Sequence, residues 1–306
     1  MNLQSFLNSR RAGKLALLIS GMLPPSMGHR LARYLADWIS KHDQLPLNQA
    51  LRSNRWVISQ GGVTANQLEE AARQNLRNIA HSFYTLFHYL NDPVTLQNLV
   101  AFTPQIEDLI VRSQKSEAGV IVAGLHLSNF DLVFQAAALH GLRAIGLSLP
   151  EANEAIQWQH EFRQLAGLEI LPASVANFRH VINRLEAGET VVTGIDRPIG
   201  TAKTRPLFFG RPAHVPVHYI HLALKARVPL IIMGAILHPD GVYHIQSSDY
   251  IELQHFSDRE TEILWNAEMI LEIAADIIRQ TPEQWAVMQP VWPEALADIP
   301  KEVYHA

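Results

Sequence analysis

Apolar residues follow a helical period in the first hundred positions of the chain. Between 25 and 100 they recur every three or four residues, and Thr64 forms a potential capping box with Gln67. Asn91-Asp92-Pro93 is typical of a helix end. The stripe between these two signals comprises Leu68, Ala72, Leu76, Ile79, Phe83, Phe87 and Leu90. We therefore predict a helical N-terminal region over 1–100.

From residue 119 onwards, short apolar runs alternate with amphipathic segments. The runs Gly119–Ala123, Thr190–Thr193 and Val228–Met233 are β-branched and lack polar alternation. Strands of this kind are buried on both faces, which favours a parallel sheet covered by helices. Between and around the runs, the apolar period predicts helices over 129–140, 152–166, 176–187 and 216–227.

A final long helix is predicted after a capping box of Ser257 and Glu260, and Thr281-Pro282 ends it. Its apolar stripe comprises Ile263, Leu264, Ala267, Ile270, Leu271, Ala274 and Ile278. The alternation of strands and helices indicates the α/β class. We expect a central, largely parallel or mixed sheet flanked by helices, with the core at 101–306 and the N-terminal region packed on it as one integrated domain.

The composition removes several classes of protein. The 306 residues include no cysteine, so a disulfide framework and a cysteine-ligated zinc or iron–sulfur site are excluded. A hydrophobic content of 48% argues against disorder. Without a cysteine or a Gly-x-Ser-x-Gly elbow, the usual acyl-enzyme nucleophiles have no motif.

Charge is distributed unevenly along the chain. Residues 1–60 carry eight basic side chains and two acidic ones, a net charge of +6, so the other 246 residues carry −10 of the total −4. A basic segment on an acidic body favours an anionic partner, either lipid or nucleic acid. A solvated helix face would show the same excess.

The longest early apolar run, Leu15–Leu23, follows three basic side chains. It is much shorter than the roughly 20 residues that a membrane-spanning helix needs, and Pro24-Pro25 gives no signal-peptide cleavage site. An interfacial helix on an anionic membrane surface fits the pattern, with a buried first helix as the alternative. Trp285 and Trp292 have the same two readings, at the membrane interface or packed over the edge of the sheet.

The stretch Val122–Asp131 places polar groups where a buried strand ends. His126 follows the strand, and Ser128 can cap the next helix, so that Asp131 falls in the first turn. Reactive groups of α/β proteins lie outside the carboxyl ends of strands. Asp131 would accept a hydrogen bond from the imidazole Nδ1–H, leaving Nε2 to take a proton from a hydroxyl. Alternatively, Ser128 and Asp131 form only a capping box. A His–Asp pair without a nucleophile suits direct transfer to an acceptor hydroxyl.

His126-x-x-x-x-Asp131 resembles the H-x4-D signature of glycerolipid acyltransferases. Over about residues 13–293 the chain is similar to the bacterial lipid A late acyltransferases of the lauroyl/myristoyl type, and closer still to their phosphatidylinositol mannoside acyltransferase relatives. The further motifs that carry the resemblance are Arg163, AGLEILP (166–172), Phe178-Arg179, VINRLEAGE (181–189), Gly194-Ile195-Asp196-Arg197, Phe208-Phe209-Gly210-Arg211-Pro212-Ala213, ARVPLI (226–231), Pro282-Glu283-Gln284-Trp285 and MQPVW (288–292).

The resemblance implies an α/β acyltransferase fold, a site at the membrane surface and an acyl thioester donor, either acyl-coenzyme A or acyl-carrier protein. It implies that His126 is the base and Asp131 its partner. The acceptor is a membrane lipid or glycolipid, and the enzyme would sit peripherally on the cytoplasmic face of the cell membrane, with no bound cofactor, metal or nucleic acid. Candidates for substrate binding are Arg163, Asp196, Arg197, Arg211, Ser128 and Asn129.

The chain departs from the family pattern in two places. The family often carries a second acidic residue where this chain has Pro198. The mannoside branch carries an acidic residue shortly before its Phe-Phe-Gly, where this chain has Lys203 and Arg205. Both differences bear on the acceptor. The basic side chains of this loop suit substrate phosphates, or are simply solvated.

His214, His218 and His221 offer a different reading of the chain. Their spacing makes a zinc site conceivable, because imidazoles are good zinc ligands. A metal-assisted lipid hydrolase is therefore one rival function. A non-enzymatic, peripheral lipid-binding protein that uses the basic N-terminus is the other.

Overall fold

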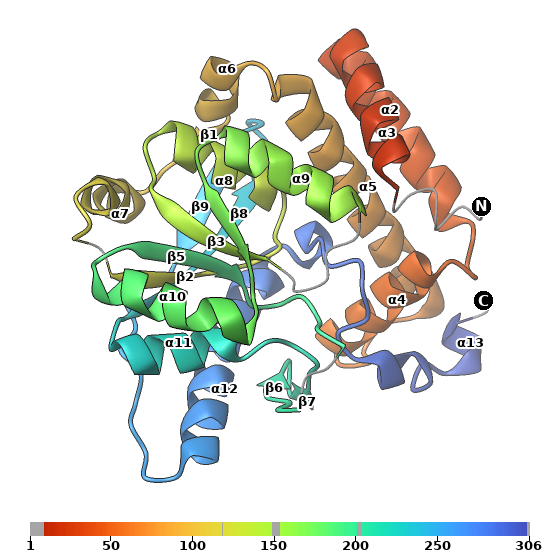
Figure 1. Cartoon of the computed structure of the whole chain (residues 1–306). Coiled ribbons are helices and arrows are strands. Elements are labelled where there is room, and N and C mark those ends of the chain that lie inside the picture. Colours follow the sequence, from red (N-terminus) through yellow and green to blue (C-terminus); the bar gives the residue numbers. More distant parts are fainter. Residues whose placement is uncertain (1–8, 118, 149–153, 201–202, 305–306) are drawn as a thin grey trace.

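The computed structural model describes residues 9–117, 119–148, 154–200 and 203–304 (Figure 1). Within these residues, seven strands form one sheet in the order β1-β9-β8-β2-β5-β3-β4. Only the β8–β9 pair is antiparallel. The strands are β1 (Val100–Ala101), β2 (Val120–Gly124), β3 (Ala144–Ser148), β4 (Glu169–Pro172), β5 (Thr190–Gly194), β8 (Leu230–Leu237) and β9 (Tyr243–Ser247). The predicted α/β class with a largely parallel, mixed sheet is confirmed.

The three apolar runs of the sequence form β2, β5 and β8, the adjacent strands at the middle of the sheet. Their side chains alternate between two hydrophobic clusters: Ile121 and Ala123 face one, Val120 and Val122 the other. Burial on both faces explains why these runs lack polar alternation. The pattern did not predict the outer strands β3, β4 and β9. β4 is exposed at both ends and β9 carries polar side chains, whereas β3 has a buried apolar centre.

Helices cover both faces of the sheet (Figure 1). One face packs against α10 (Val175–Glu186), α11 (His218–Ala226) and α12 (Arg259–Gln280). The opposite face packs against α5 (Ala65–Tyr89), α6 (Pro93–Asn98), α7 (Pro104–Gln114), α8 (Phe130–Leu139) and α9 (Glu154–Leu165). The observed α8 to α11 match the four predicted helices within one or two residues at most ends.

The helix caps confirm one sequence prediction and correct another. Thr64 and Gln67 form the predicted capping box of α5, with Gln67 Oε1 2.9 Å from the Thr64 backbone nitrogen. At α12 the predicted box of Ser257 and Glu260 is wrong. Asp258 is the N-cap, and its carboxylate accepts a hydrogen bond of 2.7 Å from the backbone N–H of Thr261. A carboxylate at this position satisfies a free N–H group and interacts favourably with the helix dipole.

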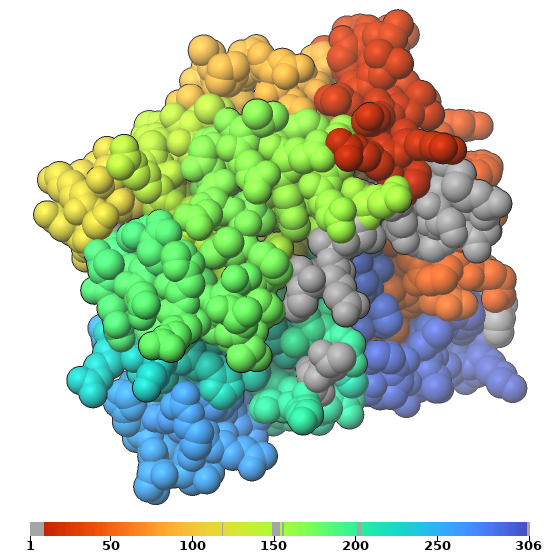
Figure 2. Space-filling model, in the orientation of Figure 1, coloured from red at the N-terminus to blue at the C-terminus, as the bar shows by residue number. Residues whose placement is uncertain are grey.

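Before α5, the N-terminal region contains α2 (Arg10–Met22), α3 (Pro25–Ser40) and α4 (Pro46–Ile58). The helices α2 and α3 form one corner of the molecule, coloured red in Figures 1 and 2, on the far side of the sheet from α12. None of the helices in the described part of the chain has both the length and the apolar character that a membrane span requires.

Helices α4 and α5 hold the C-terminal segment that follows α12. Asn75 of α5 donates through Nδ2 to the backbone oxygens of Pro282, Glu283 and Trp285, at 3.1, 3.0 and 3.1 Å. Asn54 of α4 accepts a hydrogen bond of 3.0 Å from the backbone N–H of Val291. The short elements of this end of the chain are η1 (Pro282–Gln284), η2 (Pro293–Leu296) and α13 (Lys301–Tyr304). The two N-terminal helices thus fix the backbone on which Trp285 is mounted.

Trp285 and Trp292 lie in the protein core, with 2% and 0% of their surface exposed. They pack against Phe208 and Phe209, which belong to a hairpin of β6 (Leu207–Phe208) and β7 (Arg211–Pro212). The reading of both indoles as membrane-interface residues is therefore wrong, and the packing alternative is correct.

Replacing Asn75 with leucine should destabilise the fold, because three backbone oxygens lose their common donor in a buried place. We expect the free energy of unfolding to fall by about 2–3 kcal/mol, measured by urea denaturation. Asn183→Leu, at an exposed position of α10, is the control and should change it by less than about 0.5 kcal/mol. Equal effects of the two substitutions would show that Asn75 does not anchor the C-terminal segment.

Candidate active site

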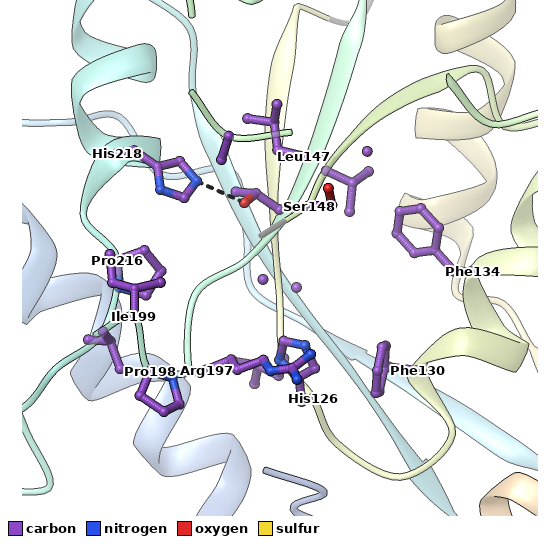
Figure 3. A pocket seen from close by; sticks show the side chains of 18 of the residues that line it. His126, Phe130, Phe134, Leu147, Ser148, Arg197, Pro198, Ile199, Pro216 and His218 are labelled. Atoms are coloured by element: carbon purple, nitrogen blue, oxygen red, sulfur yellow. Dashed lines mark hydrogen bonds between the residues drawn. The ribbon is translucent and has the colours of Figure 1, made fainter. Parts of the chain in front are cut away.

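A cavity of about 700 Å³ opens at the carboxyl ends of β2, β3 and β5 (Figure 3). Phe130 and Phe134 of α8 line one wall, and Pro198, Ile199 and Pro216 line the wall that faces them. Ligands of open α/β sheets bind at this edge, outside the carboxyl ends of the strands. The cavity is therefore the candidate active site, and His126 lies in it.

The register of β2 and β5 brings His126 and Asp196 together. The strands are parallel neighbours, and Gly124 is paired with Gly194. His126 lies two residues after Gly124, and Asp196 lies two residues after Gly194. The same offset from a paired position places both side chains at the same edge of the sheet.

Asp196 is fully buried, and its carboxylate accepts three hydrogen bonds. Oδ1 lies 2.6 Å from His126 Nδ1, and Oδ2 accepts from the His126 backbone N–H at 2.9 Å. Oδ2 also accepts from Trp285 Nε1 at 2.8 Å. These three donors replace the water that the carboxylate loses on burial. Asp196 therefore orients both the backbone and the ring of His126.

The hydrogen bond to Asp196 determines which nitrogen of His126 faces the cavity. Because Nδ1 donates to the carboxylate, Nε2 is the nitrogen available to accept a proton. The ring also packs edge-on against Phe130, with centroids 4.5 Å apart. On its other side, a Cβ atom at Gly194 would lie 2.5 Å from the ring carbon Cε1. Glycine at this position leaves the space that the imidazole occupies.

The sequence prediction that Asp131 accepts the Nδ1–H of His126 is wrong in this structure. Asp131 does lie in the first turn of α8, as expected, but its carboxylate pairs with Arg163. Arg163 Nε donates to Oδ1 at 2.7 Å, and both side chains line the cavity. The Nδ1 side of His126 faces β5, where Asp196 already occupies the acceptor position.

Ser128 and Asn129 have structural contacts outside the cavity. Ser128 does not cap α8: its φ of 50° is left-handed, and Asn129 occupies the N-cap position without a side-chain cap. Asn129 donates 2.9 Å to the backbone oxygen of Ser82 on α5. The backbone N–H of Ser128 donates a hydrogen bond of 2.7 Å to the backbone oxygen of Gln284. Both residues fix the loop that carries His126.

The two arginines expected to bind substrate have different positions. Arg197 lines the cavity beside His126, and its Nε donates 3.2 Å to Gln289 Oε1. Burial lowers the pKa of Arg197 from its ordinary value, and the positive charge of Arg163 adds to this effect. Arg211, by contrast, does not line the cavity and forms an ion pair of 2.5 Å with Asp298.

His160 is a cavity residue that the sequence reasoning missed. It lies on α9 three residues before Arg163, a spacing that places both side chains on one helical face. Its Nε2 is buried and has no hydrogen-bond partner among the described residues. Burial, together with the nearby positive charge of Arg163, lowers the pKa of His160 to about 4. The side chain is therefore neutral at physiological pH.

Two of the three histidines of the alternative zinc site, His218 and His221, have separate side-chain partners. His218 Nε2 lies 3.0 Å from Thr193 Oγ1, and burial lowers the pKa of His218 to about 4. His221 Nδ1 lies 3.4 Å from the guanidinium of Arg259. Across the described ranges, no group of three histidine, aspartate or glutamate side chains is placed to hold a metal ion. The geometry therefore gives no support to the metal-dependent rival.

Away from the polar end, the cavity lining is predominantly apolar. Phe134 of α8 and Leu147 of β3 contribute to this part (Figure 3), and Phe178 of α10 is a further lining residue. Further apolar lining residues are Val133, Ile156, Ile170, Val192, Val215 and Met233. The cavity thus combines a polar end that holds a His–Asp pair and arginines with a long apolar part, which suits a substrate with a reactive polar group and a hydrocarbon chain.

Comparison with known proteins gives one family. The family model described as bacterial lipid A biosynthesis acyltransferase matches residues 4–294. This range contains every residue that lines the cavity. A search of the curated proteins gives no match.

Asp196→Asn should reduce acyl transfer far more than Asp131→Asn. An amide cannot provide the carboxylate that holds His126 Nδ1–H and stabilises the imidazolium, so we expect kcat to fall by about 10²–10⁴-fold. Asp131→Asn leaves this pair intact, and its loss of kcat should be less than about tenfold. The measurement is the steady-state rate of each variant, with thermal unfolding as the control for folding. The reverse order would mean that Asp131 serves the base during catalysis.

Proposed function

The chain belongs to the bacterial lipid A biosynthesis acyltransferase family, and we propose that it transfers a fatty acyl group to a hydroxyl of a membrane lipid or glycolipid. The donor in this proposal is an acyl thioester, either acyl-coenzyme A or acyl-carrier protein. The observation that carries the proposal is the His126–Asp196 pair at the polar end of a largely apolar cavity. No metal or bound cofactor takes part in the proposed reaction.

In the proposed mechanism, His126 acts as general base. Nε2 takes the proton of the acceptor hydroxyl while its oxygen attacks the thioester carbonyl. Asp196 holds the tautomer and stabilises the imidazolium that forms, as in other His–carboxylate pairs. The imidazolium then protonates the departing thiolate. The transfer needs no nucleophile from the protein, in keeping with a chain that has no cysteine.

The lining of the cavity supports a division of the substrates. The apolar part around Phe134, Leu147 and Phe178 would hold the acyl chain, whose burial is favourable by about 0.8 kcal/mol per CH₂ group. Arg163 at the polar end and the exposed Lys203 at the edge of the cavity would attract anionic groups of the donor or acceptor.

His126→Ala should abolish acyl transfer, with kcat reduced by about 10²–10⁴-fold, while circular dichroism and thermal stability stay near those of the wild type. The assay uses radiolabelled acyl-coenzyme A, or acyl-carrier protein, with extracted membrane lipids. Labelled lipid is the expected product of the wild type. His140→Ala, at a histidine outside the cavity, is the matched control and should retain activity. Full activity of His126→Ala would overturn the assignment. Release of free fatty acid alone by the wild type would indicate a hydrolase. Lipid binding by the wild type without any acylated product would indicate a lipid-binding protein.

A second part of the proposal concerns the membrane. Seven of the fourteen large hydrophobic side chains that are exposed in the described part of the chain lie on α2 and α3. Leu18, Met22 and Tyr34 are 61%, 74% and 68% exposed. Exposed basic side chains on or next to these helices are Arg10, Arg11, Lys14, Arg30, Arg33 and Lys41. An apolar surface with basic neighbours suits an anionic lipid bilayer. We propose that α2 and α3 hold the enzyme on the cytoplasmic face of the cell membrane.

Leu18→Asp should weaken binding to vesicles of phosphatidylcholine and phosphatidylglycerol by about tenfold, because it removes apolar surface that the bilayer would bury and adds a negative charge. Co-sedimentation measures the bound fraction, which should also fall as salt rises. Val111→Asp changes the charge equally at an exposed apolar position on α7 and should bind as the wild type does. Equal binding of the two variants would contradict the role of α2 and α3.

A further inference from the structure

Arg197 is held in the cavity by its position next to Asp196. Asp196 is buried and bonded to His126, so the backbone of the following residue is fixed relative to the base. The Arg197 side chain then enters the cavity beside the His126 ring (Figure 3). Its Nε bonds Gln289 Oε1, which anchors the guanidinium at one edge and leaves the two terminal nitrogens to face other groups.

The two arginines of the cavity differ in their partners. Arg163 is paired with the Asp131 carboxylate. Among residues that the structure describes, Arg197 forms no ion pair; its contact at Nε is with the neutral amide of Gln289. A partly buried cation without a carboxylate at contact distance is costly to keep. The carboxylates Asp131 and Asp196 offset this cost from a greater distance, since they act against the burial that lowers the pKa of Arg197.

We infer that the Arg197 guanidinium stabilises the negative charge that develops on the thioester carbonyl oxygen during transfer. The inference rests on the proposed function. A reacting carbonyl must lie within reach of His126 Nε2, and Arg197 is the cation that lines the cavity beside this ring. Donors fixed in advance at such a place stabilise a transition state without reorganising.

The step balances as follows at this site. The acceptor oxygen forms a bond to the carbonyl carbon, its proton passes to His126 Nε2, and the carbonyl electron pair moves onto the oxygen that faces Arg197. The C=O bond then re-forms, the C–S bond breaks, and His126 returns the proton to the sulfur. Arg197 gives up no proton and serves as a hydrogen-bond donor and positive charge, as suits a guanidinium.

Steady-state kinetics of Arg197→Gln and Arg197→Lys test the role. We expect Arg197→Gln to lower kcat by about 10²–10³-fold, with KM for both substrates changed by less than about threefold, because the interaction forms in the transition state. Arg197→Lys should have a higher kcat than Arg197→Gln, since lysine keeps the positive charge but lacks the planar set of N–H donors of a guanidinium. Lys225→Gln removes an exposed cation of α11 outside the cavity and should match the wild type. A variant that raises KM and keeps kcat would overturn the inference.

A binding experiment separates this inference from the proposed function. The probes are a trifluoromethyl ketone analogue of acyl-coenzyme A, whose hydrate resembles the tetrahedral intermediate, and the matching thioether without the carbonyl. Wild-type protein should prefer the ketone, and Arg197→Gln should lose this preference while binding the thioether normally. An unchanged preference in Arg197→Gln would refute the role of Arg197 alone. If the wild-type protein binds neither analogue and does not bind acyl-carrier protein, the thioester donor is refuted, and both proposals with it.

Discussion

The buried carboxylate of Asp196 connects three parts of the chain that are far apart in sequence. Asp196 follows the adjacent strand β5 by two residues, and its carboxylate bonds the backbone and the ring of His126 beyond the end of β2. It also accepts a hydrogen bond from the indole of Trp285. A charge in this position is tolerated only while all its donors stay in place. Trp285 in turn depends on Asn75 of α5, which bonds its backbone oxygen. The N-terminal helices therefore support the site without entering the cavity.

The polar end of the cavity has a definite electrostatic order. The buried carboxylate of Asp196 bonds His126 on the Nδ1 side, and the guanidinium groups of Arg163 and Arg197 line the cavity. Arg163 is paired there with the carboxylate of Asp131. His160 adds a neutral imidazole to the same end, because burial and Arg163 keep it unprotonated. In the proposed reaction, Asp196 would stabilise a proton taken up by His126, and Arg197, whose contact at Nε is a neutral amide, would favour negative charge on the substrate. This arrangement suits a reaction in which a proton moves to the base while an oxyanion forms.

The sequence pattern identified the three strands in the middle of the sheet, which are buried on both faces, and missed the strands outside them. The runs in β2, β5 and β8 are buried on both faces, so their composition alone marks them as central strands. At the edge of the sheet, the two end residues of β4 are exposed, so its sequence pattern does not distinguish it from a loop. Trp285 and Trp292 pack in the core, which is one of the two readings that the sequence left open. The hydrogen bond from Trp285 to Asp196 left no local signal, because it joins residues that are 89 positions apart.

The sequence by itself determined the α/β class, the helical N-terminus, the position of His126 at a strand end and the family. It did not determine the partner of His126. Spacing along the chain favoured Asp131, five residues away, whereas the parallel register of β2 and β5 aligned Gly124 with Gly194 and brought Asp196 across 70 residues. The spacing of apolar residues and the composition of a segment indicate which side chains a single helix or strand buries. Contacts between elements depend on which strands become neighbours, and the fold of the whole chain decides that.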